Sequence, residues 1–305
     1  MAVLARPIDM LHAKLGDKVK ENVSLAPYTS ARIGGPADIF ITADSAAELA
    51  KIVKLLWKHE LPYIILGGGS NVLVSDRGVR GVVILNRAKG VRFHGGDQPS
   101  VTVESGVVFS NLANRCASKG LSGLEWAATV PGTVGGAVYG NAGAFDSDMA
   151  GNLICAELLT KNGRERFTVG QMGYGYRTSA LKRGEVKAVV LLAELSLKNS
   201  TKEEVTVKVQ QLGAHRKATQ HPGASMGSMF KNPPGDYAGR LIEAAGLKGT
   251  RIGSAEISPL HGNFFVNHAN TRAEDIRALI QLVQKTVKEK LGVELDLEVE
   301  LIGEW

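Results

Sequence analysis

A glycine-rich stretch near the middle of the chain constrains the fold most strongly. From Pro131 to Gly143 it contains five glycines, one proline and almost no side chain able to carry out chemistry. Glycine loses more backbone freedom on folding than any other residue, so ordering such a stretch is costly. Two interpretations are about equally good: backbone N–H groups that bind the pyrophosphate of a nucleotide cofactor, or a run of tight turns in a β-rich domain.

Two further glycine-rich segments lie closer to the N-terminus. Tyr28–Pro36 leads into an expected strand at 38–42, and the expected strand Tyr63–Leu66 runs directly into Gly67–Asn71. Strand character resumes at Val72–Val74. A Rossmann fingerprint would instead need G-x-G-x-x-G opening a helix, with an acidic residue about 20 positions later. A nucleotide bound here would therefore lie in a different fold.

Length and composition limit the class of protein. A chain of 305 residues predicts two or three domains. Its apolar share of 44% is ordinary for a soluble globular protein. No apolar run approaches the roughly 20 residues needed to cross a bilayer, which predicts no membrane insertion. The net charge of +6, without a long basic run, favours anionic small molecules over nucleic acid.

The N-terminus and the cysteines bear on location. Met1–Pro7 has no charged region followed by a long apolar core, so we expect no signal peptide. Two cysteines, Cys116 and Cys155, are too few for a disulfide framework or a metal site. They are expected to be reduced packing residues in a cytoplasmic protein.

Periodicity and capping signals divide the chain into three units. Residues 1–80 and 81–200 are predicted to form two α+β subdomains, and residues 201–305 a separate α+β domain. Helices are expected after the capping box at Ser45, at 109–119, from Thr201, at about 236–245, and from the cap Thr271 to Gly292. Strands are expected at 81–85, 101–104 and 186–197, with a hairpin turn at Lys161–Gly163 and a half-buried strand at 293–301.

Three separated groups of residues resemble the UDP-N-acetylenolpyruvoylglucosamine reductase family, flavoenzymes of peptidoglycan precursor synthesis. They are Gly67–Asn71, Pro131–Gly143, and a C-terminal set comprising Tyr176–Ser179, Gly227–Pro233 and Leu295–Val299. The resemblance covers nearly the whole chain in the right order. It implies a two-subdomain FAD-binding module of the vanillyl-alcohol-oxidase type followed by a substrate-binding domain. The short gap from Arg177 to Ser228 resembles the subgroup that lacks an inserted tyrosine-bearing loop.

The resemblance also implies a reaction. NADPH would reduce FAD, and hydride would pass to the methylene carbon of the enolpyruvyl ether of UDP-N-acetylglucosamine. Arg177 and Glu298 would stabilise the resulting enolate through the substrate carboxylate, and Ser228 would protonate it. Without the resemblance, each of the three has a plainer role. Arg177 would be a surface arginine, Ser228 a turn serine and Glu298 one of several solvated carboxylates.

Further positions are implied for ligand binding. The expected FAD-binding residues are Arg32, Gly34, Tyr63, Gly67, Gly68, Gly69, Ser70, Asn71, Thr129, Pro131, Gly132, Thr133, Gly135, Gly136, Asn141 and Gly143. The expected UDP-sugar contacts are Tyr176, Arg216, Lys231, Asn232 and His261. Arg216, Lys231 and Asn232 could equally be solvated surface groups, and for His261 a loop cap is the favoured alternative. Lys231 offers a point charge and Arg216 a bidentate fork for a diphosphate.

Two other classes of function remain open. One is an oxidase or dehydrogenase with the same FAD module and a different alcohol or lactone as substrate, which would not need Arg177, Ser228 and Glu298 together. The other is a nucleotide-binding protein without turnover. No pattern in the sequence predicts an oligomeric state.

Overall fold

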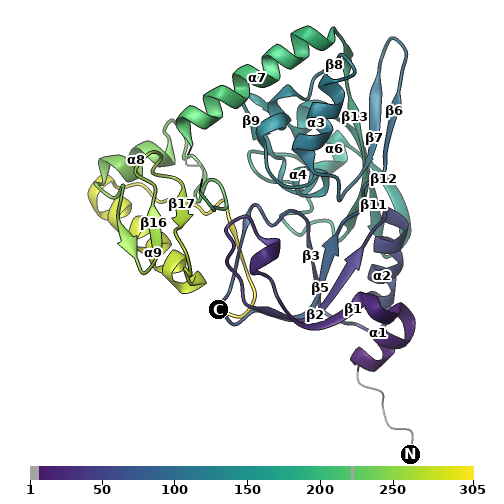
Figure 1. Cartoon of the computed structure of the whole chain (residues 1–305), viewed down its shortest axis with the longest axis horizontal. Helices are drawn as coiled ribbons and strands as arrows, with labels where there is room; N and C mark the ends of the chain where they lie inside the picture. Colours follow the sequence, from purple (N-terminus) through teal and green to yellow (C-terminus); the bar gives the residue numbers. More distant parts are fainter. Residues whose placement is uncertain (1–6, 221–222) are drawn as a thin grey trace, which may run out of the picture.

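The computed structural model describes residues 7–220 and 223–305. Figure 1 shows two sheets with their helices, followed by a smaller domain that contains α8 and α9. The expected α+β organisation is confirmed. Of the N-terminal residues for which no signal peptide is expected, Met1–Arg6 lie outside the described part of the chain. Within the described part, no helix is both long and apolar enough to span a bilayer.

The first sheet has the strand order β1-β2-β5-β3. Its strands are β1 (Val19–Ser24), β2 (Pro36–Ala43), β5 (Val79–Asn86) and β3 (Tyr63–Leu66). β2 and β3 both run parallel to β5, whereas β1 is antiparallel to β2. The expected boundary at residue 80 falls inside β5, so the first sheet continues to Asn86 before the chain enters the second.

Helix α2 (Ala46–Lys58) joins the first sheet to the second. It begins where expected, because the Ser45 side chain accepts a hydrogen bond from Glu48 N at 3.1 Å. Its apolar residues, among them Leu49 and Ile52, share one core with Val189 and Leu191 of the second sheet. The helix therefore lies between the two sheets. Near it, α1 (Pro7–Leu15) and the 3₁₀ turn Gly16–Lys18 precede β1, and a second 3₁₀ turn covers Ala26–Tyr28.

The second sheet is antiparallel, in the order β12-β11-β13-β7-β6. Its strands are β12 (Gly163–Thr168), β11 (Leu153–Thr160), β13 (Val189–Ser196), β7 (Ser100–Glu104) and β6 (Val91–His94). Thr160 pairs with Gly163, which confirms the expected hairpin turn. Minor elements of this unit are β8 (Leu121–Ser122), β9 (Gly143–Ala144), β10 (Ser147–Asp148), β14 (Lys198–Asn199), α5 (Met149–Asn152) and α6 (Val169–Met172).

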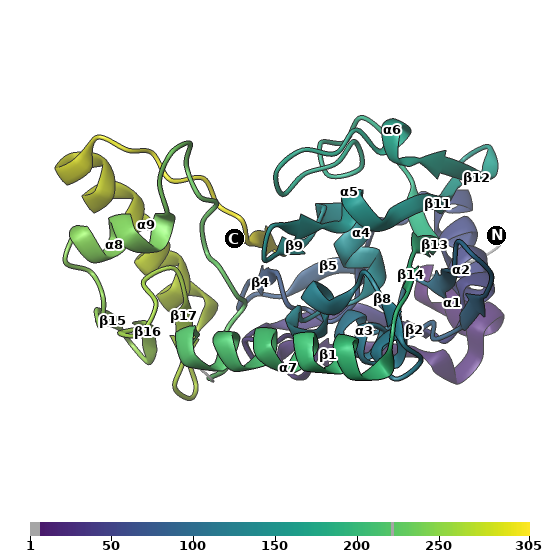
Figure 2. The same cartoon turned by 90° about the horizontal axis from the view of Figure 1, so that it is seen from above.

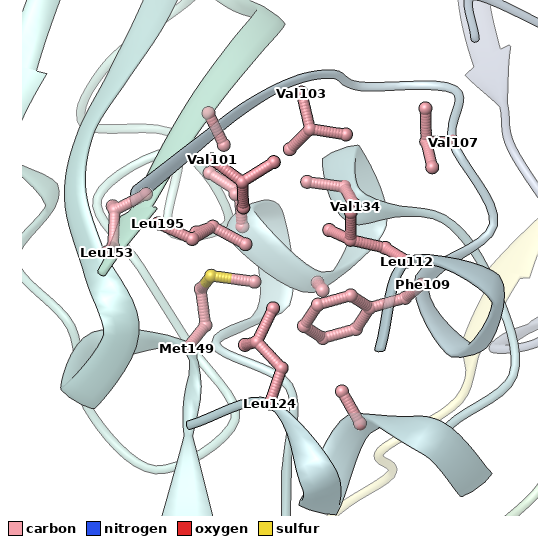
Figure 3. Close-up of a cluster of buried hydrophobic side chains, with 14 of the residues drawn as sticks. Val101, Val103, Val107, Phe109, Leu112, Leu124, Val134, Met149, Leu153 and Leu195 are labelled. Carbon is pink, nitrogen blue, oxygen red and sulfur yellow. The ribbon is translucent and has the colours of Figure 1, made fainter. Parts of the chain in front are cut away.

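The core of the second unit lies between this sheet and α3 (Phe109–Ala117), the 3₁₀ helix Glu125–Thr129 and α4 (Val134–Gly140). Figure 3 shows Phe109 and Leu112 of α3 facing Val101 and Val103 of β7. The Phe109 ring meets Trp126 edge-on, with centroids 5.3 Å apart. This core fixes the base on which the glycine-rich stretch rests.

Helix α4 corrects the expectation of an irregular loop from Pro131 to Gly143. Thr133 caps the helix, and Val134, Ala137 and Val138 are buried at the spacing of one helical face. The low helix propensity of glycine hid this short pattern in the sequence. Asn141 ends the helix in the left-handed region, with φ 47°.

The C-terminal domain follows α7 (Lys202–Thr219), which begins at the expected capping box of Thr201 and Glu204. Figure 2 shows α7 running along the flank of the second unit toward this domain. The domain packs α8 (Ala238–Ala244) and α9 (Ala273–Leu291) around one core, beside the three-stranded sheet of β15 (Arg251–Ile252), β16 (Ala255–Ile257) and β17 (Phe265–Asn267).

The expected cap of α9 at Thr271 is wrong, because the N-cap residue is Arg272. Asp76, from the loop after β4 (Val72–Val74), accepts hydrogen bonds from Ala273 N at 2.8 Å and Glu274 N at 3.1 Å. A carboxylate almost 200 residues away in sequence thus satisfies two of the free N–H groups at the helix start. The domain is thereby tied to the first unit.

The expected strand at 293–301 is mostly wrong. Only β18 (Glu300–Ile302) enters a sheet, pairing parallel with β4. The alternating pattern still places Leu295 and Val299 in the core. The preceding residues cross between domains, where they have single hydrogen bonds to the 229–231 segment instead of a neighbouring strand.

Candidate active site

Two of the glycine-rich segments pack directly on each other. A Cβ atom on Gly68 would lie 2.8 Å from the Cα of Gly132, and one on Gly67 would overlap the Thr133 side chain. Gly132 also has φ +102°, a conformation that favours glycine. The third segment joins them, since Ser30 N donates to Gly69 O at 2.9 Å. These glycines are required for close approach of backbone to backbone.

A cavity of about 290 Å³ opens beside this junction. Its lining comes from the Tyr28–Pro36 segment, from the start of the Pro131–Gly143 stretch with the preceding Thr129, and from α7 and the C-terminal domain. It comprises Ser30, Thr129, Pro131, Arg216, Gln220, Gly223, Ser225, Gly227 and Phe264. The lining carries hydroxyl and backbone groups but no carboxylate.

Arg216 is the cation of this cavity. Its Nη1 lies 3.4 Å from Thr129 Oγ1, and it forms no ion pair with any carboxylate in the described chain. Burial lowers the pKa of Arg216, with no neighbouring carboxylate to oppose the effect. A half-buried guanidinium without a counter-charge favours an anionic ligand in the cavity.

Arg177 sits in a strained turn. Gly175 and Thr178 exchange both backbone hydrogen bonds, at 3.1 and 3.2 Å, and Arg177 occupies the third position with φ +57°. A non-glycine residue in the left-handed region costs about 1–2 kcal/mol, and such residues cluster at functional sites. Asn141 Nδ2 donates to Gly175 O at 3.0 Å, so the end of α4 supports the turn.

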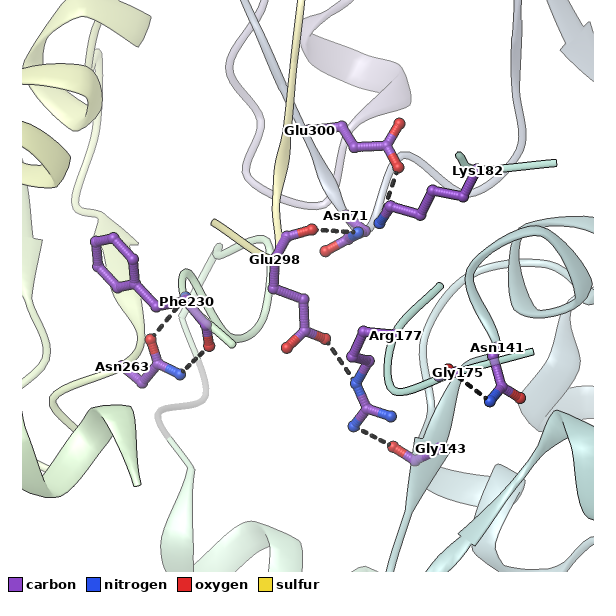
Figure 4. A network of polar contacts seen from close by, with 10 residues as sticks. All are labelled: Asn71, Asn141, Gly143, Gly175, Arg177, Lys182, Phe230, Asn263, Glu298 and Glu300. Carbon is purple, nitrogen blue, oxygen red and sulfur yellow. Dashed lines mark hydrogen bonds and ion pairs between the residues drawn. The ribbon is translucent and has the colours of Figure 1, made fainter. Parts of the chain in front are cut away.

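The turn directs the Arg177 side chain toward Glu298 (Figure 4). Arg177 Nε lies 3.0 Å from Glu298 Oε1, and Nη2 donates to Gly143 O at 2.7 Å. Both side chains are largely buried, with 24% and 18% exposed. Burial raises the pKa of Glu298 despite the opposing charges of Arg177, Lys182 and Lys231. The site can therefore hold Glu298 protonated at a higher pH than an ordinary glutamate.

Hydrogen bonds to the backbone of Glu298 connect the remaining segments to it. Asn71 Nδ2 donates to Glu298 O at 3.0 Å, and Glu298 N donates to Met229 O at 2.9 Å. Ser228, adjacent to Met229, is part-buried and bridges to Phe264. The structure thus brings the segments of Arg177, Ser228 and Glu298 together beside the Gly67–Asn71 loop.

A second cavity, of about 320 Å³, lies beside Tyr176 of the Arg177 turn. It is lined by Tyr176, Lys231, Asn232, Pro233, Pro234, Glu294 and Asp296. Three of the five expected UDP-sugar contacts therefore share one cavity. Asn232 also accepts a hydrogen bond from Ala238 N at 3.1 Å, which supports the start of α8.

The other two expected sugar contacts lie elsewhere. Arg216 belongs to the first cavity, beside the glycine-rich stretch. His261 Nδ1 accepts from Asn263 N at 3.2 Å, and its ring meets Phe264 with centroids 4.8 Å apart. Burial lowers the pKa of His261. Its position is that of a loop-capping residue, the alternative that its sequence context left open.

Two of the expected FAD-binding residues, Tyr63 and Asn141, have hydrogen-bond partners within the protein. The Tyr63 hydroxyl accepts from Trp57 Nε1 at 2.9 Å and faces the α2 core. The Asn141 side chain is 96% buried and bonds Asp148, Ala150 and Gly175. Arg32 is exposed in a left-handed turn at φ +57°. The remaining candidates cluster at the junction of the glycine-rich segments or, for Asn71 and Gly143, at the Arg177–Glu298 pair.

Sequence reasoning missed Lys182 beside the site. Lys182 Nζ pairs with Glu300 Oε1 at 3.1 Å. The alternation of 293–301 grouped Glu300 with Glu298 as solvated carboxylates, but no local pattern distinguishes Lys182 from a surface lysine. Glu294 and Asp296 in the second cavity were likewise seen only as solvated carboxylates.

Comparison with known proteins gives consistent results across the chain. Residues 217–302 match the family described as "UDP-N-acetylenolpyruvoylglucosamine reductase, C-terminal domain", and residues 37–168 match the "FAD binding domain" family. The UDP-N-acetylenolpyruvoylglucosamine reductase of Bacillus pumilus is 43% identical over 97% of both chains. That of Bacillus subtilis is 43% identical over 94% of both. The crystal structure of the Thermus caldophilus reductase has a TM-score of 0.77 at 37% identity, covering 92% of this chain and 97% of that one.

Proposed function

The chain belongs to the UDP-N-acetylenolpyruvoylglucosamine reductase family, and on this basis we propose that it reduces the enolpyruvyl ether of UDP-N-acetylglucosamine with NADPH. It is an FAD-binding oxidoreductase. The observation that carries the proposal is the meeting of Arg177 and Glu298, 3.0 Å apart, beside the Gly67–Asn71 loop and the Ser228 segment. The alternative FAD-module oxidases have no need of this combination.

The residues at the first cavity fit FAD. The lining has backbone-rich segments, hydroxyls and one half-buried cation, without a carboxylate to repel a phosphate. We assign Ser30, Thr129 and Arg216 to the pyrophosphate part of the cofactor. When bound, FAD supplies the hydride that adds to the enolpyruvyl methylene carbon. This assignment moves Arg216 from the sugar to the cofactor.

Arg177 and Glu298 act on the substrate carboxylate. Hydride addition leaves negative charge shared between the α-carbon and that carboxylate, so donors aimed there stabilise the intermediate. The Arg177 guanidinium has N–H groups beyond the two engaged with Glu298 and Gly143. Glu298, with its raised pKa, becomes a donor once protonated. The strained turn keeps the guanidinium in place before the substrate arrives.

Ser228 protonates the enolate carbon. A serine hydroxyl is a weak acid, but a carbanion-like enolate is a strong base, so the transfer is chemically reasonable. Ser228 lies between Gly227 of the first cavity and Met229, which binds the backbone of Glu298. This location, between the cofactor cavity and the acid pair, supports the role.

The second cavity is assigned to the UDP-sugar. Lys231 supplies a positive charge for the diphosphate, and Tyr176 supplies an aromatic surface. Asp296 and Glu294 can accept hydrogen bonds from hydroxyls or the base N–H. We thus assign the cofactor mainly to the two sheet units, expected at residues 1–80 and 81–200, with Arg216 added from the third unit. The sugar is assigned mainly to residues 201–305, with Tyr176 added from the second.

One assay tests the proposal. Purified protein should be yellow with bound flavin and should consume NADPH in proportion to added enolpyruvyl-UDP-N-acetylglucosamine. A colourless protein that binds no added FAD would reject both flavoenzyme alternatives. NADPH consumption that is indifferent to the substrate would reject the reductase and favour an oxidase. Product analysis should find UDP-N-acetylmuramate.

A further inference from the structure

A second ion pair links the two segments that carry Arg177 and Glu298. Lys182 Nζ lies 3.1 Å from Glu300 Oε1. Glu298 lies just before the bend at Val299, and Glu300 begins β18 directly after it, so the two carboxylates belong to one short segment. Arg177 and Lys182 both belong to the irregular segment between α6 and β13. Figure 4 shows the two pairs spanning the same gap between these segments.

The Lys182 pair differs from an ordinary surface ion pair. The Lys182 side chain is 17% exposed and that of Glu300 is 34% exposed. Exposed pairs contribute about 0–1 kcal/mol, but removing one partner of a largely buried pair leaves the other charge without compensation. Glu300 is the one carboxylate with which Lys182 pairs in the described residues. The contact is therefore a defined link between the two segments.

Other contacts of the Arg177 segment attach it to α4 and not to the Glu298 segment. Ser179 Oγ donates to Tyr139 O at 2.6 Å, and Tyr174 Oη donates to Val138 O at 3.0 Å. Both attach the segment to α4. Among the described residues, the ion pairs that attach it to the Glu298–Glu300 segment are those of Arg177 and Lys182. Hydrogen bonds that Arg177 and Glu298 make to a substrate carboxylate would compete with their own pair.

We infer that Lys182 is a positioning residue for the reduction, whose ion pair with Glu300 keeps the Arg177 turn and the Glu298 segment at a fixed spacing when substrate engages the first pair. The inference rests on the proposed function. Lys182 does not contact the reacting atoms in this assignment. It acts through the geometry of Arg177 and Glu298, because a displacement of about 1 Å at a catalytic group can cost 100-fold in rate.

Several charged residues surround Glu298 and Glu300, and a test must distinguish their electrostatic effects from the effect of spacing. Glu298 is influenced by Arg177, Lys182 and Lys231, and all three lower its pKa against the effect of burial. Glu300 faces Lys182 and adds to the raised pKa of Tyr139. A change at Lys182 thus alters both the spacing of the segments and the charge near Glu298. Restoring the pair with reversed charges distinguishes the two effects.

The first experiment compares Lys182→Met with Lys182→Arg. Lys182→Met should lower kcat at saturating substrate by about tenfold or more, while the rate of flavin reduction by NADPH stays within about twofold. Lys182→Arg, which can still reach Glu300, should recover most of kcat. Arg183→Met is the matched control, because Arg183 pairs with Glu185 at the exposed surface of the same segment. It should leave kcat unchanged.

The second experiment reverses the pair with Lys182→Glu and Glu300→Lys. The double variant should turn over at least about tenfold faster than either single variant if spacing is the main contribution. The inference is overturned if Lys182→Met matches the wild type in kcat, or if the reversed pair is no faster than the single variants. A wild-type protein that fails to reduce the substrate overturns the proposed function itself. Wild-type turnover with an indifferent Lys182→Met overturns the positioning role alone.

Discussion

Arg177 Nε lies 3.0 Å from Glu298 Oε1, although 121 residues separate the two in the chain. The contact crosses from the second sheet unit to the segment that returns from the C-terminal domain. It places a cation against a carboxyl group that burial holds at a raised pKa. A pair of this kind combines a guanidinium charge and several N–H donors with a carboxyl group that keeps its proton to a higher pH than an ordinary glutamate. This combination suits stabilisation of an enolate.

The first prediction concerns the pH dependence of stability. The folded pKa of Glu298 is raised above 4.5, so between pH 4.5 and the folded pKa the native state holds a proton that the unfolded state has released. The free energy of unfolding of the wild type, minus that of Glu298→Gln, should fall as pH rises through this window and be level below it. Denaturant titrations at intervals from pH 4 to pH 8 measure the difference. A difference that rises with pH would show a depressed pKa instead.

Ser228→Ala is predicted to separate the two half-reactions. Loss of a proton donor typically costs about 10²- to 10⁴-fold in the step that it assists. Reduction of flavin by NADPH should remain within about twofold of the wild type, while oxidation of the reduced enzyme by substrate slows by that factor. Stopped-flow absorbance of the flavin follows both steps. Equal slowing of both half-reactions would contradict the assigned role and indicate a general disturbance of the site.

Local patterns predicted much of the fold. Capping boxes at Ser45 and Thr201 located the starts of α2 and α7, because the signal lies within four residues. The start of α9 was misplaced, since its free N–H groups bind Asp76 from another unit. The alternation at 293–301 correctly indicated that Leu295 and Val299 are buried. It could not show whether another strand lies beside this segment, because such a strand would come from a distant part of the chain.

In the candidate site, too, features that depend on contacts between distant segments could not be predicted from local sequence patterns. Arg177, Ser228 and Glu298 were identified through resemblance alone, and their approach depends on hydrogen bonds between remote segments such as Asn71 to Glu298. Arg216 was assigned to the sugar from its residue type alone. A positive charge suits either diphosphate, so the sequence could not show which cavity the side chain lines. The role of Lys182 could not be predicted from the sequence either. Its burial and its partner arise only from tertiary packing.

Arg216→Met is predicted to weaken FAD binding. The guanidinium is half-buried, pairs with no carboxylate of residues 7–220 or 223–305, and lies beside Thr129 and the cavity at Pro131. A hydrogen bond to a charged group is worth about 1.5–3 kcal/mol, so the Kd for FAD should rise by about 10- to 100-fold. Flavin titration of apoprotein measures it, with exposed Lys217→Met as the control. An unchanged Kd for FAD with a raised KM for the UDP-sugar would return Arg216 to the sugar site.

Gly68→Ala is predicted to separate the glycine-rich segments from each other. The new Cβ would lie 2.8 Å from the Cα of Gly132, and backbone on both sides leaves no flexible side chain to move away. Overpacking of this kind costs about 1–3 kcal/mol, so the free energy of unfolding should fall by that amount and the protein should purify with less flavin. Gly170→Ala is the matched control, because Gly170 is exposed in α6 and its added Cβ would meet only Thr168 at 3.9 Å. If Gly68→Ala retained wild-type stability and flavin content, close packing of the two segments would not be what requires glycine at this position.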